Sequence, residues 1–382
     1  MSGAANREAA SGGAENRGAA SGAPVLIMAG GTGGHVFPAL AVARVLRERG
    51  ISVVWLGVPG SMESRLVPAN GFPIEWVRVG GVRGKSLKTR LLAPVTVVRA
   101  VIQAWRVLRR VRPRAVLGLG GYVSGPGGIA AWLLRIPLLI HEQNAIAGMT
   151  NRVLAHFASQ VLEAFPGSFG SKDGGRARAI GNPVRADIAA LPPPEVRFAN
   201  RDSRSRLLIF GGSQGAQRLN SVVPQALASL STEHRPLIRH QTGERGLEAA
   251  RAAYAQAQIE AEVLPFIDDM AEAYAWADLA VCRAGAMTVT ELQAAGLGAI
   301  FVPLPVATDD HQTRNAEVMV QSGAGRVIQE RDLTPERLGE AIGELITNRG
   351  HLLKMAEAAR GSRIIDAAAR LADLCTAAGA HA

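Results

Sequence analysis

Cysteine is nearly absent from this sequence. The 382 residues include only Cys282 and Cys375, and neither lies in a CxxC or Cys/His arrangement. A disulfide framework and a structural zinc site are therefore excluded, and a reducing compartment is favoured. Long apolar runs are also missing: no stretch of about 18 uninterrupted apolar residues occurs, so we expect no membrane-spanning helix.

Acidic residues are missing from one long stretch. None occurs between Glu75 and Glu142, although basic residues are frequent there and the net charge of the chain is +10. This asymmetry predicts an anionic partner, which could be nucleic acid, a membrane surface or a phosphorylated substrate. Aromatic residues make up only 4% of the chain. Because recognition of RNA or single strands relies on exposed aromatics among the charges, we expect no nucleic-acid partner.

What the chain has in abundance is short, continuous apolar runs that alternate with amphipathic segments. This pattern is typical of βα units in which each strand is buried on both faces of a parallel sheet. The pattern starts at Val25 and starts again at Arg206. The expected strands are Val25–Ala29, Ile51–Leu56, Ala115–Leu119, Pro137–His141 and Gln160–Phe165, then Leu207–Phe210, Leu237–Gln241, Glu262–Ile267, Leu279–Cys282, Ala299–Pro303 and Gly325–Ile328.

The fold class predicted from this repetition is α/β, with two Rossmann-like domains whose parallel sheets face a central cleft. Three consecutive prolines in a polar segment mark a linker between the halves. We predict a disordered low-complexity tail at 1–23, an N-terminal domain at 24–189, a linker at 190–204, a C-terminal domain at 205–349, and a C-terminal helix and tail at 350–382. The terminal helix could cap either half.

A glycine turn follows the first expected strand. It reads "GGTGGH" from Gly30 to His35 and precedes a helix expected at Pro38–Arg49. Glycines there let backbone N–H groups approach an anion at the positive end of a helix. The turn is neither a Walker A loop nor GxGxxG, so a tight turn without a ligand is the alternative. His35 adds an imidazole at its rim, which is either a general base or a group that hydrogen-bonds a phosphate.

Similar turns follow other strands. They run from Gly118 to Gly128, from His141 to Gly148, from Gly211 to Ala216, from Cys282 to Leu292 and from Asp309 to Ala316. In the fourth, a carboxylate can accept from two ribose hydroxyls, or it can simply stabilise the start of a helix. No two aspartates are spaced as Asp-x-Asp, an arrangement that holds a metal on the pyrophosphate in many sugar-nucleotide enzymes. Helix N-termini and Arg185 would then stabilise the leaving group.

Eight motifs together carry a specific resemblance. In order they are "GGTGGH", "GGYVSGPGG", "HEQN", "GNPVR", "GGSQGA", "FIDDM", "CRAGAMTVTE" and "DHQTRNA". This order resembles the MurG family, part of glycosyltransferase family 28, from about Val25 to beyond Asn315. The resemblance implies a GT-B type fold and an inverting, metal-independent hexosyltransferase that uses no cofactor. It implies transfer of N-acetylglucosamine from UDP-N-acetylglucosamine to the 4-hydroxyl of N-acetylmuramyl-pentapeptide on undecaprenyl pyrophosphate, which converts lipid I to lipid II.

The resemblance also implies roles for individual residues. His35 is the catalytic residue. Glu291 would bind ribose, the backbone of Ile267 uracil, and Gln312 the sugar. The full set expected to bind the UDP-sugar is Thr32, Gly33, Gly34, Asn144, Arg185, Ser213, Ile267, Ala286, Met287, Thr288, Val289, Thr290, Glu291 and Gln312. The set expected to bind the acceptor is Gly31, Gly121, Tyr122, Ser124 and Glu142.

A polyprenyl-linked acceptor implies a location at the cytoplasmic side of the cell membrane. The segment from Gly84 to Arg110 mixes basic and apolar residues with Trp105, an aromatic suited to the membrane interface. We therefore expect peripheral binding to an anionic membrane surface through Arg83, Lys85, Lys88 and Arg90. The alternative is an ordinary solvated face over a buried stripe.

Three other functions use parts of the same pattern. A UDP-sugar epimerase would share the donor site but needs catalytic carboxylates near the anomeric carbon. A nicotinamide-dependent oxidoreductase is disfavoured because neither domain's first glycine turn is GxGxxG. A two-lobed sugar-nucleotide sensor would make no use of His35.

Overall fold

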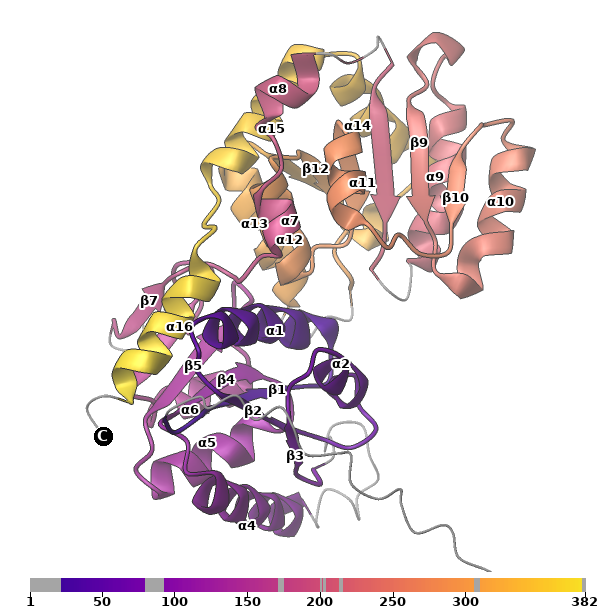
Figure 1. Ribbon diagram of the computed structural model, residues 1–382. Helices are drawn as coiled ribbons and strands as arrows, with labels where there is room; N and C mark the ends of the chain where they lie inside the picture. The colour runs from indigo at the N-terminus through magenta and orange to yellow at the C-terminus, as the bar shows by residue number, and fades with distance from the viewer. Residues whose placement is uncertain are drawn as a thin grey trace, which may run out of the picture.

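The computed structural model describes residues 22–79, 93–170, 175–199, 201, 204–212, 216–305 and 310–379. These residues form two α/β domains, each built on one twisted sheet (Figure 1). All strand pairings among them are parallel. The predicted fold class is therefore confirmed.

The N-terminal sheet has seven strands in the order β3-β2-β1-β4-β5-β6-β7. The strands are β1 (Val25–Ala29), β2 (Val53–Gly57), β3 (Ile74–Trp76), β4 (Ala115–Gly120), β5 (Leu138–Glu142), β6 (Gln160–Glu163) and β7 (Ala177–Ala179). Its helices are α1 (Gly33–Glu48), α2 (Glu63–Ala69), α4 (Ala93–Val111), α5 (Ser124–Leu133) and α6 (Met149–Leu154). The chain reverses its winding between β1 and β4, and ligands bind at such switch points in open α/β sheets.

The C-terminal sheet has six strands in the order β10-β9-β8-β11-β12-β13. They are β8 (Arg206–Phe210), β9 (Leu237–Gln241), β10 (Glu262–Leu264), β11 (Leu279–Cys282), β12 (Ala299–Phe301) and β13 (Gly325–Val327). Its helices are α9 (Gln217–Ala228), α10 (Leu247–Gln256), α11 (Met270–Trp276), α12 (Ala286–Ala295), α13 (His311–Gln321), α14 (Pro335–Ile346) and α15 (Arg349–Gly361), with short 3-10 turns at Thr232–His234, Glu244–Gly246 and Glu330–Asp332. The switch point lies between β8 and β11.

Strand β1 shows why the central strands read as continuous apolar runs. Val25 and Ile27 pack with α1 on one face of the sheet, whereas Leu26 and Met28 pack with α4 and α5 on the other. All four side chains are fully buried. Both faces of the strand thus belong to a core, and no position is left for a polar residue.

The edges of the first sheet depart from the prediction. Strands β3 and β7 were not expected from the sequence, because their side chains are half-buried or exposed and form no apolar run. The helix expected from Pro38 begins at Gly33, so that part of the prediction is wrong and Pro38 lies inside the helix. Thr32 has extended backbone angles and occupies the N-cap position, where its carbonyl accepts from the N–H groups of His35 and Val36. The consequence is that His35 lies in the first turn of α1.

The C-terminal residues divide between the domains. Helix α15 packs on the C-terminal domain through Leu352 and Met355. Helix α16 (Ala367–Ala378) instead crosses to the N-terminal domain and lies beside α1 (Figure 1). Its Leu371 and Cys375 are fully buried in the same core as Ile27. The terminal helix therefore caps the first half.

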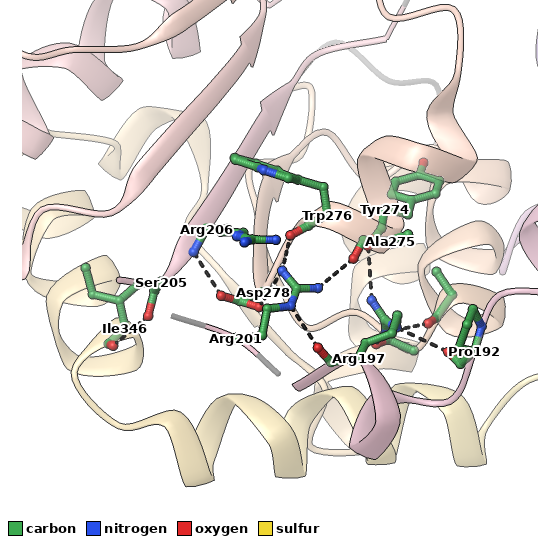
Figure 2. A network of polar contacts seen from close by, with 12 residues as sticks. Pro192, Arg197, Arg201, Ser205, Arg206, Tyr274, Ala275, Trp276, Asp278 and Ile346 are labelled. Atoms are coloured by element: carbon green, nitrogen blue, oxygen red, sulfur yellow. Dashed lines mark hydrogen bonds and ion pairs between the residues drawn. The ribbon is translucent and has the colours of Figure 1, made fainter. Parts of the chain in front are cut away.

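The segment predicted as a linker contains the helix α8 (Pro194–Ala199), preceded by the short helix α7 (Ala186–Ala189). Figure 2 shows how arginines in and beside α8 attach this segment to the C-terminal domain. Arg197 donates to the carbonyls of Tyr274 at 3.1 Å, Ala295 at 2.7 Å and Gly296 at 2.5 Å. These carbonyls lie at the C-terminal ends of α11 and α12, where a cation is stabilised by the helix dipole.

Candidate active site

Two glycine turns of the N-terminal domain meet at the carboxyl ends of β1 and β4. A Cβ atom on Gly121 would lie 2.4 Å from the carbonyl oxygen of Gly30. Gly31 and Gly121 have φ angles of 88° and 86°, which residues with a side chain rarely adopt. The two turns therefore pack against each other through bare backbone, and the contact requires glycine.

His35 lies between these turns. Its Nδ1 is 3.1 Å from the carbonyl oxygen of Gly30. Since a carbonyl oxygen only accepts, Nδ1 carries the proton and Nε2 of the neutral ring keeps a free lone pair. Burial lowers the pKa of His35 below its ordinary value of 6.5. The Gly30 hydrogen bond and the charges of Glu142 and Glu63 act in the opposite direction, but burial is the larger effect. The lowered pKa favours the neutral ring, in which Nε2 carries the lone pair.

The start of α1 provides donors for an anion. The N–H groups of Gly33 and Gly34 fall in the first turn, where helix geometry supplies no acceptor. The N–H groups of His35 and Val36 bond instead to the carbonyl of Thr32. Gly31, predicted to bind the acceptor, donates its N–H to the Glu63 carboxylate at 3.0 Å. Gly33 and Gly34 are therefore the better placed of the predicted glycines.

Two buried carboxylates hold the loops around His35. Glu63, missed by the sequence analysis, is fully buried and also accepts from the N–H of Val58 at 3.1 Å. Glu142 is 3% exposed. One of its oxygens accepts from the backbone and side chain of Asn144, and the other accepts from Gly148 N–H and the Asn151 side chain. Glu142 thus lies beneath the loop that follows β5.

The other residues predicted to bind the acceptor lie on the turn after β4. Ser124 is fully buried, and its hydroxyl donates to the carbonyl of Gly120 at 2.8 Å. It shapes the turn from below, as Glu142 does for its loop. Tyr122 is 60% exposed and is the side chain of this set that faces outward.

The C-terminal domain contains a pocket of about 780 Å³ at the carboxyl ends of β8 and β11. Two residues of the expected donor set, Thr288 and Gln312, line it, and so do Gly211, Gly212 and Gly285 of the predicted glycine turns. Sequence analysis missed further lining side chains, namely Arg218, Ser221, Arg283 and Glu330. Arg283 and Glu330 form an ion pair, which no local motif indicates. Ser213 lies outside the residues that the structure describes.

Gln312 has a defined orientation in this pocket. Its Oε1 accepts from the N–H groups of Ala284 at 3.2 Å and Leu304 at 3.0 Å. Two backbone donors settle which amide atom is the oxygen. The Nε2 group is therefore the one left to donate to a ligand.

Glu291 lies in the second turn of α12 and is held from two sides. The hydroxyl of Tyr274 donates to Oε2 at 3.0 Å, and Arg185 Nε lies 3.4 Å from Oε1. Burial raises the pKa of Glu291, while Arg185 and Tyr274 oppose the shift. Burial also raises the pKa of Tyr274 well above its ordinary value, so the phenol remains a donor. Tyr274 was not predicted, because it lies on another helix.

The remaining predicted donor residues take different positions. Ile267 is 7% exposed, and the side chains of Ala286, Val289 and Thr290 are buried, so these residues can meet a ligand only through their backbone. Met287 and Thr288 on the same helix are partly exposed. Asn144 and Arg185 reach the C-terminal domain from the other side, through Asn315 and Glu291 respectively.

Metal-binding clusters and membrane-spanning helices are both absent from the described residues. They contain no group of three His, Cys, Asp or Glu side chains that could hold a metal ion. Within the same residues, no helix combines the length and apolar character needed to span a bilayer.

Two Rossmann-like domains with parallel sheets, each with a glycine turn before a helix at its switch point, form the architecture of a GT-B type glycosyltransferase. The chain belongs to glycosyltransferase family 28. The model of the family's N-terminal domain matches residues 25–163, and the model of its C-terminal domain matches residues 206–371.

Named relatives of high identity belong to enzymes of one name, and solved structures share the fold. The UDP-N-acetylglucosamine--N-acetylmuramyl-(pentapeptide) pyrophosphoryl-undecaprenol N-acetylglucosamine transferase of Marinobacter nauticus is 55% identical over 92% of this chain and 96% of its own. The enzyme of the same name from Ralstonia nicotianae is 52% identical over 93% and 96%. The crystal structure of Acinetobacter baumannii MurG is 43% identical, covers 92% of this chain and 99% of its own, and superposes with a TM-score of 0.82. The calicheamicin glycosyltransferase CalG4, at 18% identity and a TM-score of 0.67, shares the fold.

Proposed function

We propose that this protein transfers N-acetylglucosamine from UDP-N-acetylglucosamine to the 4-hydroxyl of N-acetylmuramyl-pentapeptide on undecaprenyl pyrophosphate, making lipid II from lipid I in peptidoglycan synthesis. The observation that carries the proposal is a neutral, oriented imidazole in the first turn of α1, in a chain 55% identical to an enzyme named for this transfer. An oxidoreductase would need a nicotinamide site, and a sensor would need no base.

Incubation with UDP-N-acetylglucosamine and a short-chain lipid I analogue tests the proposal. We expect release of UDP in equal amount to the disaccharide product. With UDP-N-acetylglucosamine alone, the sugar nucleotide should be recovered unchanged. Its conversion to an epimer would favour the epimerase, and no turnover in either reaction would contradict the transferase.

The proposed donor site lies in the C-terminal domain. Glu291 would accept from the two ribose hydroxyls, and the backbone of Ile267 would meet the uracil. The N-terminus of α12, with Ser213, would bind the diphosphate. The Nε2 group of Gln312 would donate to hydroxyls of the sugar, because its oxygen is already occupied by backbone N–H groups.

The proposed chemistry is a direct displacement with inversion. Nε2 of His35 takes the proton of the acceptor's 4-hydroxyl while that oxygen bonds to the anomeric carbon. The bond from the anomeric carbon to the UDP oxygen breaks, and UDP leaves with its electron pair. Arg185 and the start of α12 stabilise the charge that develops on the diphosphate. Gly33 and Gly34 are proposed to bind phosphate oxygens at the facing helix start.

We predict that turnover persists in EDTA. Helix N-termini and Arg185 can offset the charge on the diphosphate, so a divalent metal is not required. The rate with excess EDTA should stay within about twofold of the rate with Mg²⁺, measured as UDP release. Activity that disappears on chelation and returns with Mg²⁺ or Mn²⁺ would contradict this mechanism.

The membrane-facing surface is proposed to include α4. Val95, Val98 and Ile102 are 65%, 58% and 45% exposed on this helix. Arg99 and Arg106 are exposed beside them, and a shallow pocket of about 720 Å³ lies among these residues. Apolar side chains flanked by arginines suit the interface of an anionic bilayer.

The predicted anchor differs in part from this surface. Trp105 is partly buried against the core, with the Arg109 guanidinium 4.7 Å from its ring centre. It is therefore less available to lipid than the three aliphatic residues. Arg83, Lys85, Lys88 and Arg90 lie outside the residues that the structure describes, and their role remains the prediction from sequence.

Liposome co-sedimentation tests this surface. The wild-type protein should bind vesicles containing anionic lipid and be released by high salt, since each basic residue contributes only about 1 kcal/mol near the surface. Changing Val95, Val98 and Ile102 to serine should reduce the bound fraction severalfold, as should changing Arg83, Lys85, Lys88 and Arg90 to glutamine. The control changes Val196 and Val320, also exposed on helices, to serine. Equal binding by all variants would contradict the proposed surface.

A further inference from the structure

Among the side chains of the C-terminal domain that contact the N-terminal domain, Asn315 makes direct hydrogen bonds to two of its residues. Asn315, on α13, is fully buried. Its Oδ1 accepts from the N–H of Ala145 at 2.8 Å. Its Nδ2 donates to Oδ1 of Asn144 at 3.3 Å and to the carbonyl of Ala284 at 3.1 Å. The amide thus joins the loop after β5 to the turn between β11 and α12.

Helix α13 holds that turn at two points. Gln312, one turn before Asn315, accepts from the N–H of Ala284, so both backbone polar groups of Ala284 bond to α13. The next residue, Gly285, is the N-cap of α12. The helix start proposed to bind the diphosphate is therefore tied to the same side chain that contacts the opposite domain.

The loop on the N-terminal side is itself held firmly. Glu142 binds it from below through Asn144 and Gly148. A second contact between the domains ends at the same loop: Asn182 Nδ2 donates to the carbonyl of Gln143 and to Thr290 Oγ1, both at 3.0 Å. A displacement of α12 or α13 would therefore be transmitted to the loop that carries Asn144.

We propose that Asn315 is a positioning residue that sets the register between the two domains during transfer. It places the loop bearing Asn144, and with it the domain that carries His35, relative to the turn that presents the diphosphate. The inference rests on the proposed function, because it concerns the alignment of donor and acceptor. An apolar side chain at this position would avoid the free-energy cost of desolvating a buried amide. It could not, however, form directional hydrogen bonds to both domains. Misplacement by about 1 Å can reduce a rate by about 10²-fold.

The experiment compares Asn315→Ala and Asn315→Leu with Asn220→Ala. Leucine shares the branched shape of asparagine and is larger, whereas alanine leaves the site empty, so a defect common to both variants comes from the lost hydrogen bonds rather than from one change in packing. Asn220 is a matched control because it is 7% exposed and bonds to Thr242 O and His240, all within the C-terminal domain. Each variant is assayed for kcat with the soluble lipid I analogue, for UDP affinity by calorimetry, and for amide exchange of residues 143–148.

Both Asn315 variants should lose about 10- to 100-fold in kcat while their Kd for UDP changes less than about threefold. Their amide exchange at 143–148 should accelerate. Asn220→Ala should keep kcat within about twofold and wild-type exchange at this loop. Unchanged kcat in the Asn315 variants would overturn the inference. So would a loss of UDP affinity equal to the loss of kcat, since Asn315 would then only shape the donor pocket. An inactive wild-type protein would instead contradict the proposed transferase function.

Discussion

Replacing His35 by alanine or glutamine is expected to lower kcat by roughly 10²- to 10⁴-fold, the usual contribution of a positioned general base. The physical reason is the fixed tautomer: the Gly30 carbonyl accepts from Nδ1, so the lone pair on Nε2 is available for the acceptor's proton. The Kd for UDP should change little, because His35 lies in the other domain. Steady-state kinetics and calorimetry measure the two quantities separately.

The pH dependence gives a second test of His35. The base acts when the ring is neutral, so activity should be full above its pKa and fall as the pH drops through it. Because burial lowers this pKa below 6.5, the acidic limb of kcat/KM should lie below pH 6.5. The residual activity of the His35→Gln variant should lack that limb. His234→Gln, at an exposed histidine of the other domain, serves as the control. A variant at His35 that kept most of its kcat would reassign the residue to binding.

Replacing Glu291 by alanine is expected to raise KM for UDP-N-acetylglucosamine on the order of 10²-fold. In the proposed site the carboxylate accepts from two ribose hydroxyls, and alanine removes these charge-assisted hydrogen bonds from a largely buried position. The variant should also bind UDP and a dideoxy-ribose analogue of UDP equally. Calorimetry with both ligands measures this discrimination directly.

Two further variants define the Glu291 result. Tyr274→Phe removes the hydroxyl that donates to Glu291 at 3.0 Å, and it should raise KM severalfold with kcat nearly unchanged. Glu248→Ala is the control, because that carboxylate is 84% exposed and far along the chain on α10. A Glu291→Ala variant that still distinguished UDP from the dideoxy analogue would refute the ribose assignment.

The central strands and the glycine turns were predictable because their physical causes are local. A strand is apolar wherever helices cover both of its faces, and β1, β4, β11 and residues 207–210 of β8 satisfy this condition. Edge strands such as β3 and β7 face solvent on one side, so their composition resembles that of loops. The start of α1 was misplaced for a related reason, since Pro38 suits a first turn but is tolerated inside this helix.

Sequence by itself determined the class of the fold, the repetition of two domains and the places where anions can meet helix starts, because each follows from the order of neighbouring residues. Only the tertiary structure decided which side chains line the pocket of the C-terminal domain and which hold the loops from below. Glu63 reaches Gly31 across 32 positions, and Asn315 reaches Ala145 across 170. Such hydrogen bonds depend on distances in space that no local pattern specifies. Ser124 and Glu142 illustrate this difference. Their motifs predicted contact with the acceptor, but both side chains are buried and hydrogen-bond to the loops above them.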